Sequence, residues 1–201
     1  SLSLEQFRSY ERLDLAFTDR GHQLFVGENG SGKTNIVEAA TFLSMARSCL
    51  RAQPEDVMRW GTDFFRVRGA LVADDGTAST IEYVWQKSPK RASALFLSDV
   101  RMPLLQFIGT MPTITFLPQD LDMFTGSPSQ RRAFLDALLS QLKPDFAAKR
   151  IGYERILKQR NAMLVSIADG EAGLEDLALW DDRLAQAAAH LILAREEVIG
   201  L

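Results

Sequence analysis

The sequence predicts an α/β fold, and three neighbouring features near its start carry that prediction. A short apolar run, residues 24–26, is typical of a buried strand. The pattern Gly-x-x-x-x-Gly-Lys-Thr follows it directly, from Gly27 to Thr34. An amphipathic helical stretch then begins near Lys33. A strand, a glycine-rich loop and a helix in this order indicate a phosphate-binding loop, or P-loop.

The residue types of this loop suit a bound triphosphate. Gly27, Gly30 and Gly32 allow positive φ angles, so that successive N–H groups can turn toward an anion. The N-terminus of the following helix adds its positive end at the same point. Lys33 supplies a charge for the β- and γ-phosphates, and the Thr34 hydroxyl suits the oxygen shell of Mg²⁺. The loop therefore predicts a bound Mg-nucleoside triphosphate. A chance glycine turn is the less favoured alternative, because the flanking strand and helix are both present.

The composition is that of an ordinary globular protein. The 201 residues are 46% apolar and 24% charged, which suits one large domain or two small lobes. No apolar run is long enough to span a membrane, so we expect a cytoplasmic protein with no membrane partner. The net charge of −3 argues against nucleic-acid binding through bulk charge but does not exclude a local basic patch.

Cysteine and histidine supply no metal-binding or catalytic set. Cys49 is the only cysteine, which argues against a disulfide framework and a cysteine-based zinc site. His22 and His190 are isolated in the sequence, and neither is assigned a role.

The N-terminal part of the chain predicts short strands around the P-loop helix. Residues 2–7 and 13–17 have the pattern of two strands, and residues 22–26 that of a third strand that leads into the loop. The helix is predicted over residues 33–46. Its buried face is expected to hold Ile36, Val37, Ala40 and Leu43.

The middle of the chain predicts an antiparallel sheet. Residues 65–73 and 78–86 are rich in β-branched and aromatic side chains, and the turn between them contains Gly76, which indicates a hairpin. Residues 93–97 predict a third strand. Residues 112–117 predict a further strand, which we expect to be buried.

From Ser127 onward the pattern is helical. Ser127, Pro128 and Gln130 form a capping-box signature, so a helix is predicted from here to about residue 142. A second helical stretch runs to about residue 168. The last segment places apolar residues at alternating spacings of three and four: Leu177, Trp180, Leu184, Ala187, Leu191, Ala194, Val198 and Leu201. This heptad seam predicts an antiparallel hairpin with the preceding helix, and we expect the sequence to end inside an element.

A P-loop NTPase normally also needs an acidic residue, at the end of a second apolar strand, that can hold Mg²⁺ or its water. Asp99 follows the apolar residues 94–97, but no Glu comes after it and residues 100–103 have the pattern of a turn. Gln119 follows the predicted strand 112–117, at the strand end where ligands gather in α/β sheets. A glutamine at this position can reach the metal or orient the attacking water. The alternative is that it only caps a turn.

Several motifs resemble those of the RecF family of DNA recombination and repair ATPases, which is related to the SMC, Rad50 and ABC heads. The first are Gln6-Phe7-Arg8-Ser9-Tyr10, the P-loop itself, Arg47-Ser48-Cys49-Leu50-Arg51 and Phe116-Leu117-Pro118-Gln119-Asp120-Leu121. Gln6 and Gln119 depart from the family's usual Asn and Glu. The most specific series runs from Gly126 to Asp136 and continues with Tyr153 and with Gln159 to Leu164. The similarity covers essentially the whole chain but only the N-terminal portion of such a protein.

The resemblance implies an ABC-type ATPase head with an antiparallel β-subdomain and a helical hairpin lobe. Residues 1–126 would form the N-terminal part of lobe I, and residues 127–201 a truncated lobe II. The implied cofactors are ATP and Mg²⁺, with Lys33 and Gln119 as catalytic residues and Thr34 and Gln119 at the metal. ATP would be bound by Arg8, near the phosphates or ribose, and by Gly27, Glu28, Asn29, Gly30, Ser31, Gly32, Lys33, Thr34 and Asn35.

The resemblance also implies partners and a mode of action. In this family the signature motif, the Walker B acids and the switch histidine lie further along, and none of them is present here. ATP would lie between the P-loop of one subunit and the signature motif of another, so that ATP binding drives formation of a homodimer on DNA. Single-stranded DNA or single/double-strand junctions, and recombination mediator proteins, are the implied partners in repair, replication and the SOS response. We expect the complete protein to be a weak ATPase, and this chain alone to bind ATP weakly and hydrolyse almost none.

Two other functions are compatible with the P-loop. One is a different SMC-like ATPase head in a defence or nuclease-associated system, which a long coiled coil after residue 201 would indicate. The other is a stand-alone P-loop kinase or GTPase, which would depend on Asp99 for nucleotide binding.

The densest basic region lies between Arg47 and Arg91. If it forms a patch, its members are candidate DNA contacts, although scattered solvated charges are an equally good interpretation of each residue alone. These candidates are Arg47, Arg51, Arg66, Arg68, Lys90 and Arg91.

Overall fold

The structure, a computed structural model, describes residues 1–17 and 21–200. The chain folds as two compact units, residues 1–118 and 119–201. This division falls ahead of the predicted boundary between residues 126 and 127. The physical reason is that the short helix α4 (Asp122–Thr125) packs against α5 (Pro128–Leu142), so it belongs with the helices that follow it.

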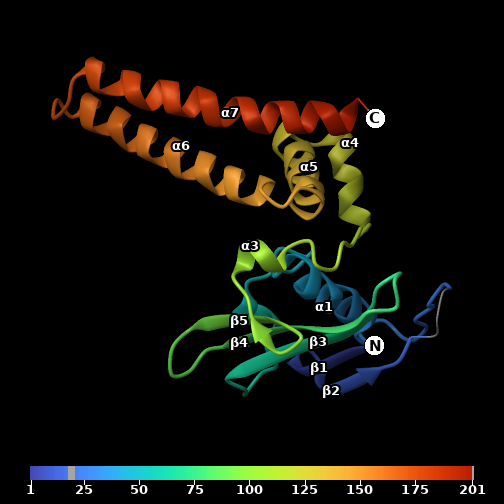
Figure 1. The fold of residues 1–201 in the computed structure, drawn as a ribbon. Helices are drawn as coiled ribbons and strands as arrows, with labels where there is room; N and C mark the ends of the chain where they lie inside the picture. Colours follow the sequence, from blue (N-terminus) through green and yellow to red (C-terminus); the bar gives the residue numbers. More distant parts are fainter. Residues whose placement is uncertain (18–20, 201) are drawn as a thin grey trace. The chain divides into compact units, whose positions relative to one another are not determined.

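Six strands of the first unit form one antiparallel sheet in the order β2-β1-β3-β4-β5-β6 (Figure 1). Their bounds are β1 Leu2–Phe7, β2 Tyr10–Leu15, β3 Phe64–Val72, β4 Ala78–Gln86, β5 Ala92–Leu97 and β6 Val100–Arg101. The predicted strands 2–7 and 78–86 are confirmed. The predicted strand 65–73 differs from β3 by one residue at each end, and the predicted strand 93–97 differs from β5 by one residue at its start. β2 begins and ends earlier than the predicted strand 13–17, because Tyr10 pairs directly with Phe7 across a tight turn.

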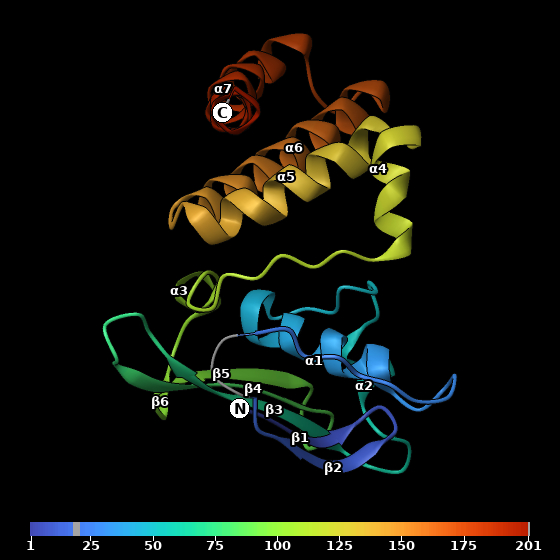
Figure 2. The same ribbon diagram turned by 90° about the vertical axis from the view of Figure 1, so that its right-hand side faces the viewer.

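Helix α1 (Lys33–Met45) covers one face of this sheet and contacts β1, β3 and β4 (Figures 1 and 2). Gly69 allows the close approach, because a Cβ atom there would lie 2.8 Å from Leu43 Cδ1. Ile36 and Leu43 are buried as predicted, but the prediction for Val37 is wrong, since its side chain is 39% exposed. The helix is rotated so that Phe42 takes the central position on the sheet.

The core between α1 and the sheet is aromatic. The rings of Phe7, Phe42 and Phe65 are fully buried and meet edge to face, with centroids 5.4 to 5.8 Å apart. Tyr83 packs on Phe42 and Phe65 from β4. Every second residue of β3 and β4 points into this cluster, which is the alternation that the sequence pattern predicted.

Burial of Tyr83 gives the stability of the fold a predictable dependence on alkaline pH. Burial raises the pKa of the phenol to about 12 from 10.0, although a hydrogen bond with Ser93 lowers it in part. The unfolded state therefore releases this proton first, so the free energy of unfolding is expected to fall between about pH 10 and pH 12 and to be unaffected by this residue below that range. Tyr83→Phe is expected to reduce the fall. Urea unfolding at several pH values checks this, and an equally steep fall in the variant would contradict it.

Two predicted strands, residues 22–26 and 112–117, are not strands in this structure. Leu24 and Val26 are 85% and 84% exposed, and Ile114 and Phe116 are 83% and 70% exposed. A strand forms only in a hydrogen-bonded ladder with another strand, and neither segment is among the paired strands of the described sheet. The expectation that residues 112–117 would be buried is therefore wrong for this chain.

The second unit is helical, with α6 (Phe146–Ala168) and α7 (Ala178–Ile199) as its long elements. They lie side by side as the predicted antiparallel hairpin (Figure 1). The heptad residues from Leu177 to Val198 are buried or half-buried. Leu191 is buried against Leu139 and Phe146. Leu201 lies outside the described residues.

The motif residues of this unit have structural roles. Gln130 Oε1 accepts a hydrogen bond from Ser127 N at 2.8 Å, which is the reciprocal half of the predicted capping box. The carboxylate of Asp136 on α5 accepts hydrogen bonds from Nε and Nη2 of Arg195 on α7, at 2.8 and 3.0 Å. Arg160 on α6 binds Asp181 on α7 at 2.6 Å. These contacts fix the three helices against one another.

The remaining elements are short turns of helix: α2 (Pro54–Val57), α3 (Leu104–Phe107), η1 (Pro118–Leu121) and η2 (Leu174–Leu177). None of the helices in the described part of the chain has the length and apolar composition needed to cross a membrane.

Candidate nucleotide-binding site

The predicted P-loop leads directly into α1 and has the left-handed backbone that its glycines allow. Gly30 and Gly32 have φ values of 85° and 95°. Gly27 does not share this conformation, so the expected positive φ there is wrong. A Cβ atom on Gly32 would lie 2.6 Å from the Tyr10 hydroxyl oxygen, so glycine is required at this position for space as well as for conformation.

Lys33 is folded back over the loop. Its Nζ donates to the carbonyl oxygens of Gly27 and Glu28 at 2.8 and 2.6 Å and lies 3.3 Å from Ser31 Oγ. The first turn of α1 contains no acidic residue, so the positive end of the helix is not neutralised from within. Thr34 is exposed at the start of this helix. The loop therefore brings an ammonium group and a helix N-terminus together on an exposed surface.

The turn between β1 and β2 braces the P-loop from the side. Asn35 Nδ2 donates to Ser9 Oγ at 3.2 Å, and the Tyr10 hydroxyl donates to Ser31 O at 3.4 Å. The backbone carbonyl of Ser9 accepts a bond from Arg59 Nη1 at 2.8 Å. Ser9 thus joins the P-loop to the segment around Arg59.

Arg8 is the first residue of this turn, and its side chain is held by a buried acid. Its Nε and Nη2 donate to Glu38 Oε2 and Oε1, both at 2.8 Å, and its Nη1 donates to Asp56 O at 2.8 Å. The hydrogen bonds with Glu38 raise the pKa of the Arg8 guanidinium, while burial opposes the shift. Arg8 therefore stays charged, with a fixed orientation. The family resemblance implied a place for Arg8 near phosphates or ribose, but not its ion pair with Glu38.

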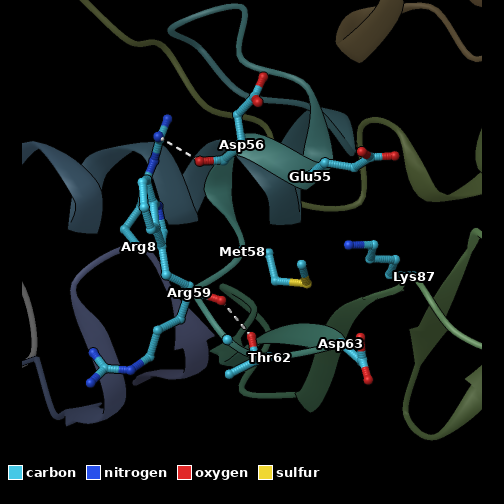
Figure 3. Close-up of a pocket in the computed structure, with 10 residues that line it drawn as sticks. Arg8, Glu55, Asp56, Met58, Arg59, Thr62, Asp63 and Lys87 are labelled. Carbon is cyan, nitrogen blue, oxygen red and sulfur yellow. Dashed lines mark hydrogen bonds between the residues drawn. The ribbon is translucent and has the colours of Figure 1, made fainter.

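A cavity of about 730 Å³ opens next to Arg8. Figure 3 shows Arg8 and Lys87 on opposite sides of it, with Asp56 and Glu55 along one edge. Trp60 also lines it, and this side chain is 97% exposed. The volume lies within the usual range for small-molecule sites, about 300 to 1,000 Å³. Charges of both signs and an aromatic ring suit a ligand with a flat, polar ring.

Sequence reasoning missed Glu38 and Trp60. A signal for Glu38 existed, because it lies four positions before Phe42 and so falls near the face of α1 that packs on the sheet. For Trp60 no periodic signal was available, since it lies in an irregular segment between α2 and β3.

Asp99 and Gln119 lie in different units. Asp99 occupies the tight turn between β5 and β6, with φ 64°, and binds Arg68 Nη2 at 3.1 Å. The turn therefore lies before residues 100–103, where it was predicted, because Val100 and Arg101 pair with β5 as the short strand β6. Gln119 is exposed in η1, at the start of the second unit, and not at the end of a strand as expected.

The candidate DNA contacts separate into two groups. Arg66 and Arg68 lie on the sheet face opposite α1 and form ion pairs with Glu5, Glu82 and Asp99 at 3.1 to 3.4 Å. Arg91 binds Glu55 at 2.7 Å. Arg47 and Arg51 are exposed after α1, and Lys90 is exposed in the turn before β5. The positive charges of Arg66 and Arg68 are therefore largely compensated by acids.

Among the described residues, no three His, Cys, Asp or Glu side chains gather to form a metal site of their own. Mg²⁺ in nucleotide sites binds mainly to phosphates, water and one or two protein oxygens. The exposed hydroxyl of Thr34 at the P-loop fits that requirement.

Comparisons with known proteins agree with this geometry. A family model described as an AAA domain matches residues 1–67. The DNA replication and repair protein RecF of Chlorobium luteolum is 34% identical over 100% of this chain and 54% of its own length. That of Renibacterium salmoninarum is 37% identical over 98% of this chain and 51% of its own. The chain thus spans about half the length of these relatives.

Solved structures give the same result. A structure of the recombination mediator protein RecF-ATPrS in the RecFOR pathway superposes with a TM-score of 0.92 at 26% identity, and covers 99% of this chain and 53% of that one. The corresponding RecF-ATP structure gives 0.89 at 26% identity. The Smc head domain of Pyrococcus furiosus gives 0.55 at 19% identity over 99% of this chain, which shows a shared fold.

The fold and the P-loop therefore define a P-loop ATPase head of the ABC type, as in the SMC proteins. Within that class the chain is of the RecF family and corresponds to the N-terminal half of its members.

Proposed function

We propose that this chain provides the ATP-binding half of a RecF-type ATPase that acts in DNA replication and recombinational repair. The observation that carries the proposal is the P-loop, where Lys33 Nζ lies over the loop carbonyls at the N-terminus of α1. Homology with RecF over the whole chain supports the biological setting.

In this proposal the phosphates lie on the loop from Gly27 to Asn35, in place of the carbonyl contacts that Lys33 now makes. Thr34 would hold Mg²⁺, which neutralises charge on the β- and γ-phosphates when bound. Lys33 would bind the same phosphates as a point charge. Arg8 would contribute its remaining N–H donors to the phosphates or the ribose.

The cavity beside Arg8 would receive the nucleobase. Ser9 connects the P-loop with the cavity. Its side chain accepts a hydrogen bond from Asn35 of the P-loop, and its carbonyl accepts one from Arg59 at the cavity. A nucleotide on the P-loop could extend past Ser9 toward the cavity. The exposed ring of Trp60 would then stack on the base, which is worth about 1–3 kcal/mol per base in other stacked sites.

This arrangement can be tested with Trp60→Ala in the complete protein. We expect the dissociation constant for Mg-ATP to increase about tenfold, because the stacking surface is lost. Affinity for inorganic triphosphate should not change, because that ligand has no base. Isothermal titration calorimetry measures both. If wild-type protein did not bind Mg-ATP, the whole proposal would fail. An equal loss for both ligands would reject only the base site.

The complete protein is further proposed to dimerise on DNA when ATP is bound and to hydrolyse ATP slowly. The signature and Walker B motifs that such a dimer needs are not in this sequence, so the isolated chain is expected to show almost no turnover. Steady-state phosphate release by the 201-residue chain checks this expectation. Substantial turnover would contradict it.

DNA contacts are proposed for Arg47 and Arg51, because both side chains are exposed in the segment that follows α1. Arg66 and Arg68 are not included, because each forms ion pairs with acids on the sheet. Each phosphate that a side chain neutralises adds about −0.9 to the slope of log K against log salt. The double variant Arg47→Ala/Arg51→Ala should therefore make the slope shallower by about 2. The matched variant Arg66→Ala/Arg68→Ala should leave it nearly unchanged. Fluorescence anisotropy with a single/double-strand junction, at several salt concentrations, distinguishes the two. Identical slopes in both variants would remove this assignment.

A further inference from the structure

Glu38 is a fully buried carboxylate on α1, the helix that begins at the P-loop. Its side chain has 0% exposure. A buried carboxylate is unfavourable unless charged and polar partners surround it. Both oxygens have such partners, since Arg8 binds each of them at 2.8 Å and Ser48 Oγ donates to Oε1 at 2.5 Å. The arrangement is a bidentate ion pair with one further hydrogen bond.

Arg8 is also constrained through its own backbone. Its φ is 53°, in the left-handed region that a non-glycine residue rarely adopts. The N–H of Arg8 donates to Val57 O at 2.7 Å, which holds that conformation. Strained backbone of this kind persists where the surroundings fix it, and it is found preferentially at functional sites. Arg8 is therefore held at both its backbone and its guanidinium.

The fixed guanidinium still has donors to offer a ligand. A guanidinium carries five N–H donors, and the contacts with Glu38 and Asp56 occupy three of them. The group lies at the wall of the cavity that we assign to the nucleotide. A side chain ordered in advance loses little rotamer entropy when the ligand binds.

We propose that Glu38 is a positioning residue of the nucleotide site, which acts by orienting Arg8 before ATP arrives. This inference rests on the proposed function of the P-loop and the cavity. Glu38 does not itself contact the nucleotide in this proposal. Its effect on affinity therefore depends on the presence of Arg8.

A double-mutant cycle with Glu38→Gln and Arg8→Ala in the complete protein tests this dependence. Glutamine keeps the shape of the side chain but cannot form the charged bidentate pair. We expect Glu38→Gln to weaken Mg-ATP binding about tenfold when Arg8 is present and less than about twofold when Arg8 is alanine. Ser48→Ala is the matched control, because it removes one bond to the same carboxylate and leaves both Arg8 contacts. It should change affinity by less than about twofold.

Equal losses for Glu38→Gln in both backgrounds would overturn the proposal, because a merely structural role does not depend on Arg8. If Glu38→Gln fails to fold, Arg8→Lys provides the test, since an ammonium keeps the charge but cannot bind both oxygens in the fork geometry. Wild-type affinity in Arg8→Lys would also overturn the proposal. Neither of these results would contradict the proposed function itself. The proposed function fails only if the wild-type protein does not bind Mg-ATP.

Discussion

Replacing Lys33 by alanine is expected to lower the affinity for Mg-ATP by about 100-fold or more. Hydrogen bonds to a charged group contribute about 1.5–3 kcal/mol, and Lys33 is the ammonium that lies over the loop carbonyls where the phosphates would bind. The fold should survive, because the P-loop is exposed and water can replace the ammonium at the carbonyls of Gly27 and Glu28. The measurement is calorimetric titration of the complete protein with Mg-ATP.

A matched control for this prediction is Lys149→Ala in the helical unit. Lys149 is an exposed lysine that pairs with Asp145 one helical turn away. Surface pairs of this kind contribute little to stability, and this residue is distant in sequence from the loop. Its replacement should leave Mg-ATP affinity unchanged. Wild-type affinity in Lys33→Ala would show that the P-loop does not bind the triphosphate.

Phe42→Ala is expected to produce the largest loss of stability, about 3–5 kcal/mol. Phe42 is fully buried, and its ring centroid lies 5.8 Å from that of Phe7, 5.4 Å from that of Phe65 and 5.0 Å from that of Tyr83. Alanine would leave a cavity between α1 and the sheet and remove three aromatic contacts. The free energy of unfolding in urea, measured on the 201-residue chain, checks the value.

Phe124→Ala is the control of the same chemistry, because Phe124 is 72% exposed. Its replacement should change the free energy of unfolding by less than about 0.5 kcal/mol. The two variants remove the same atoms, so the difference between them reports burial. Similar values for both would mean that Phe42 is not at the centre of the core.

The sequence supported the strongest predictions where the signal was local or periodic. The glycines of the P-loop, the helix that begins at Lys33 and the heptad residues up to Val198 each depend on neighbours within a few residues. The hairpin of β3 and β4 was predicted for the same reason, since a turn containing Gly76 joins two alternating runs. Homology with RecF then placed these elements in one family.

The predictions failed where a distant partner decides the outcome. Residues 22–26 and 112–117 have the composition of strands, but a strand must pair with another strand, and neither segment joins the sheet that the structure describes. The buried face of α1 was misjudged at Val37, because the rotation of a helix is set by the sheet it packs on. The position expected for Gln119 at a strand end failed together with the strand.

By itself the sequence determined the phosphate-binding loop, the periods of its helices and most of the antiparallel strands, because these follow from short-range spacing of residue types. Only the tertiary structure showed that Glu38 holds Arg8 at the wall of a cavity and that acids compensate Arg66 and Arg68. Such pairs join residues of different elements, 30 positions apart for Arg8 and Glu38 and 61 for Arg66 and Glu5. Charge alone does not say which acid a given arginine will meet. Packing brings them together, and for the fully buried Glu38 burial makes the pairing obligatory.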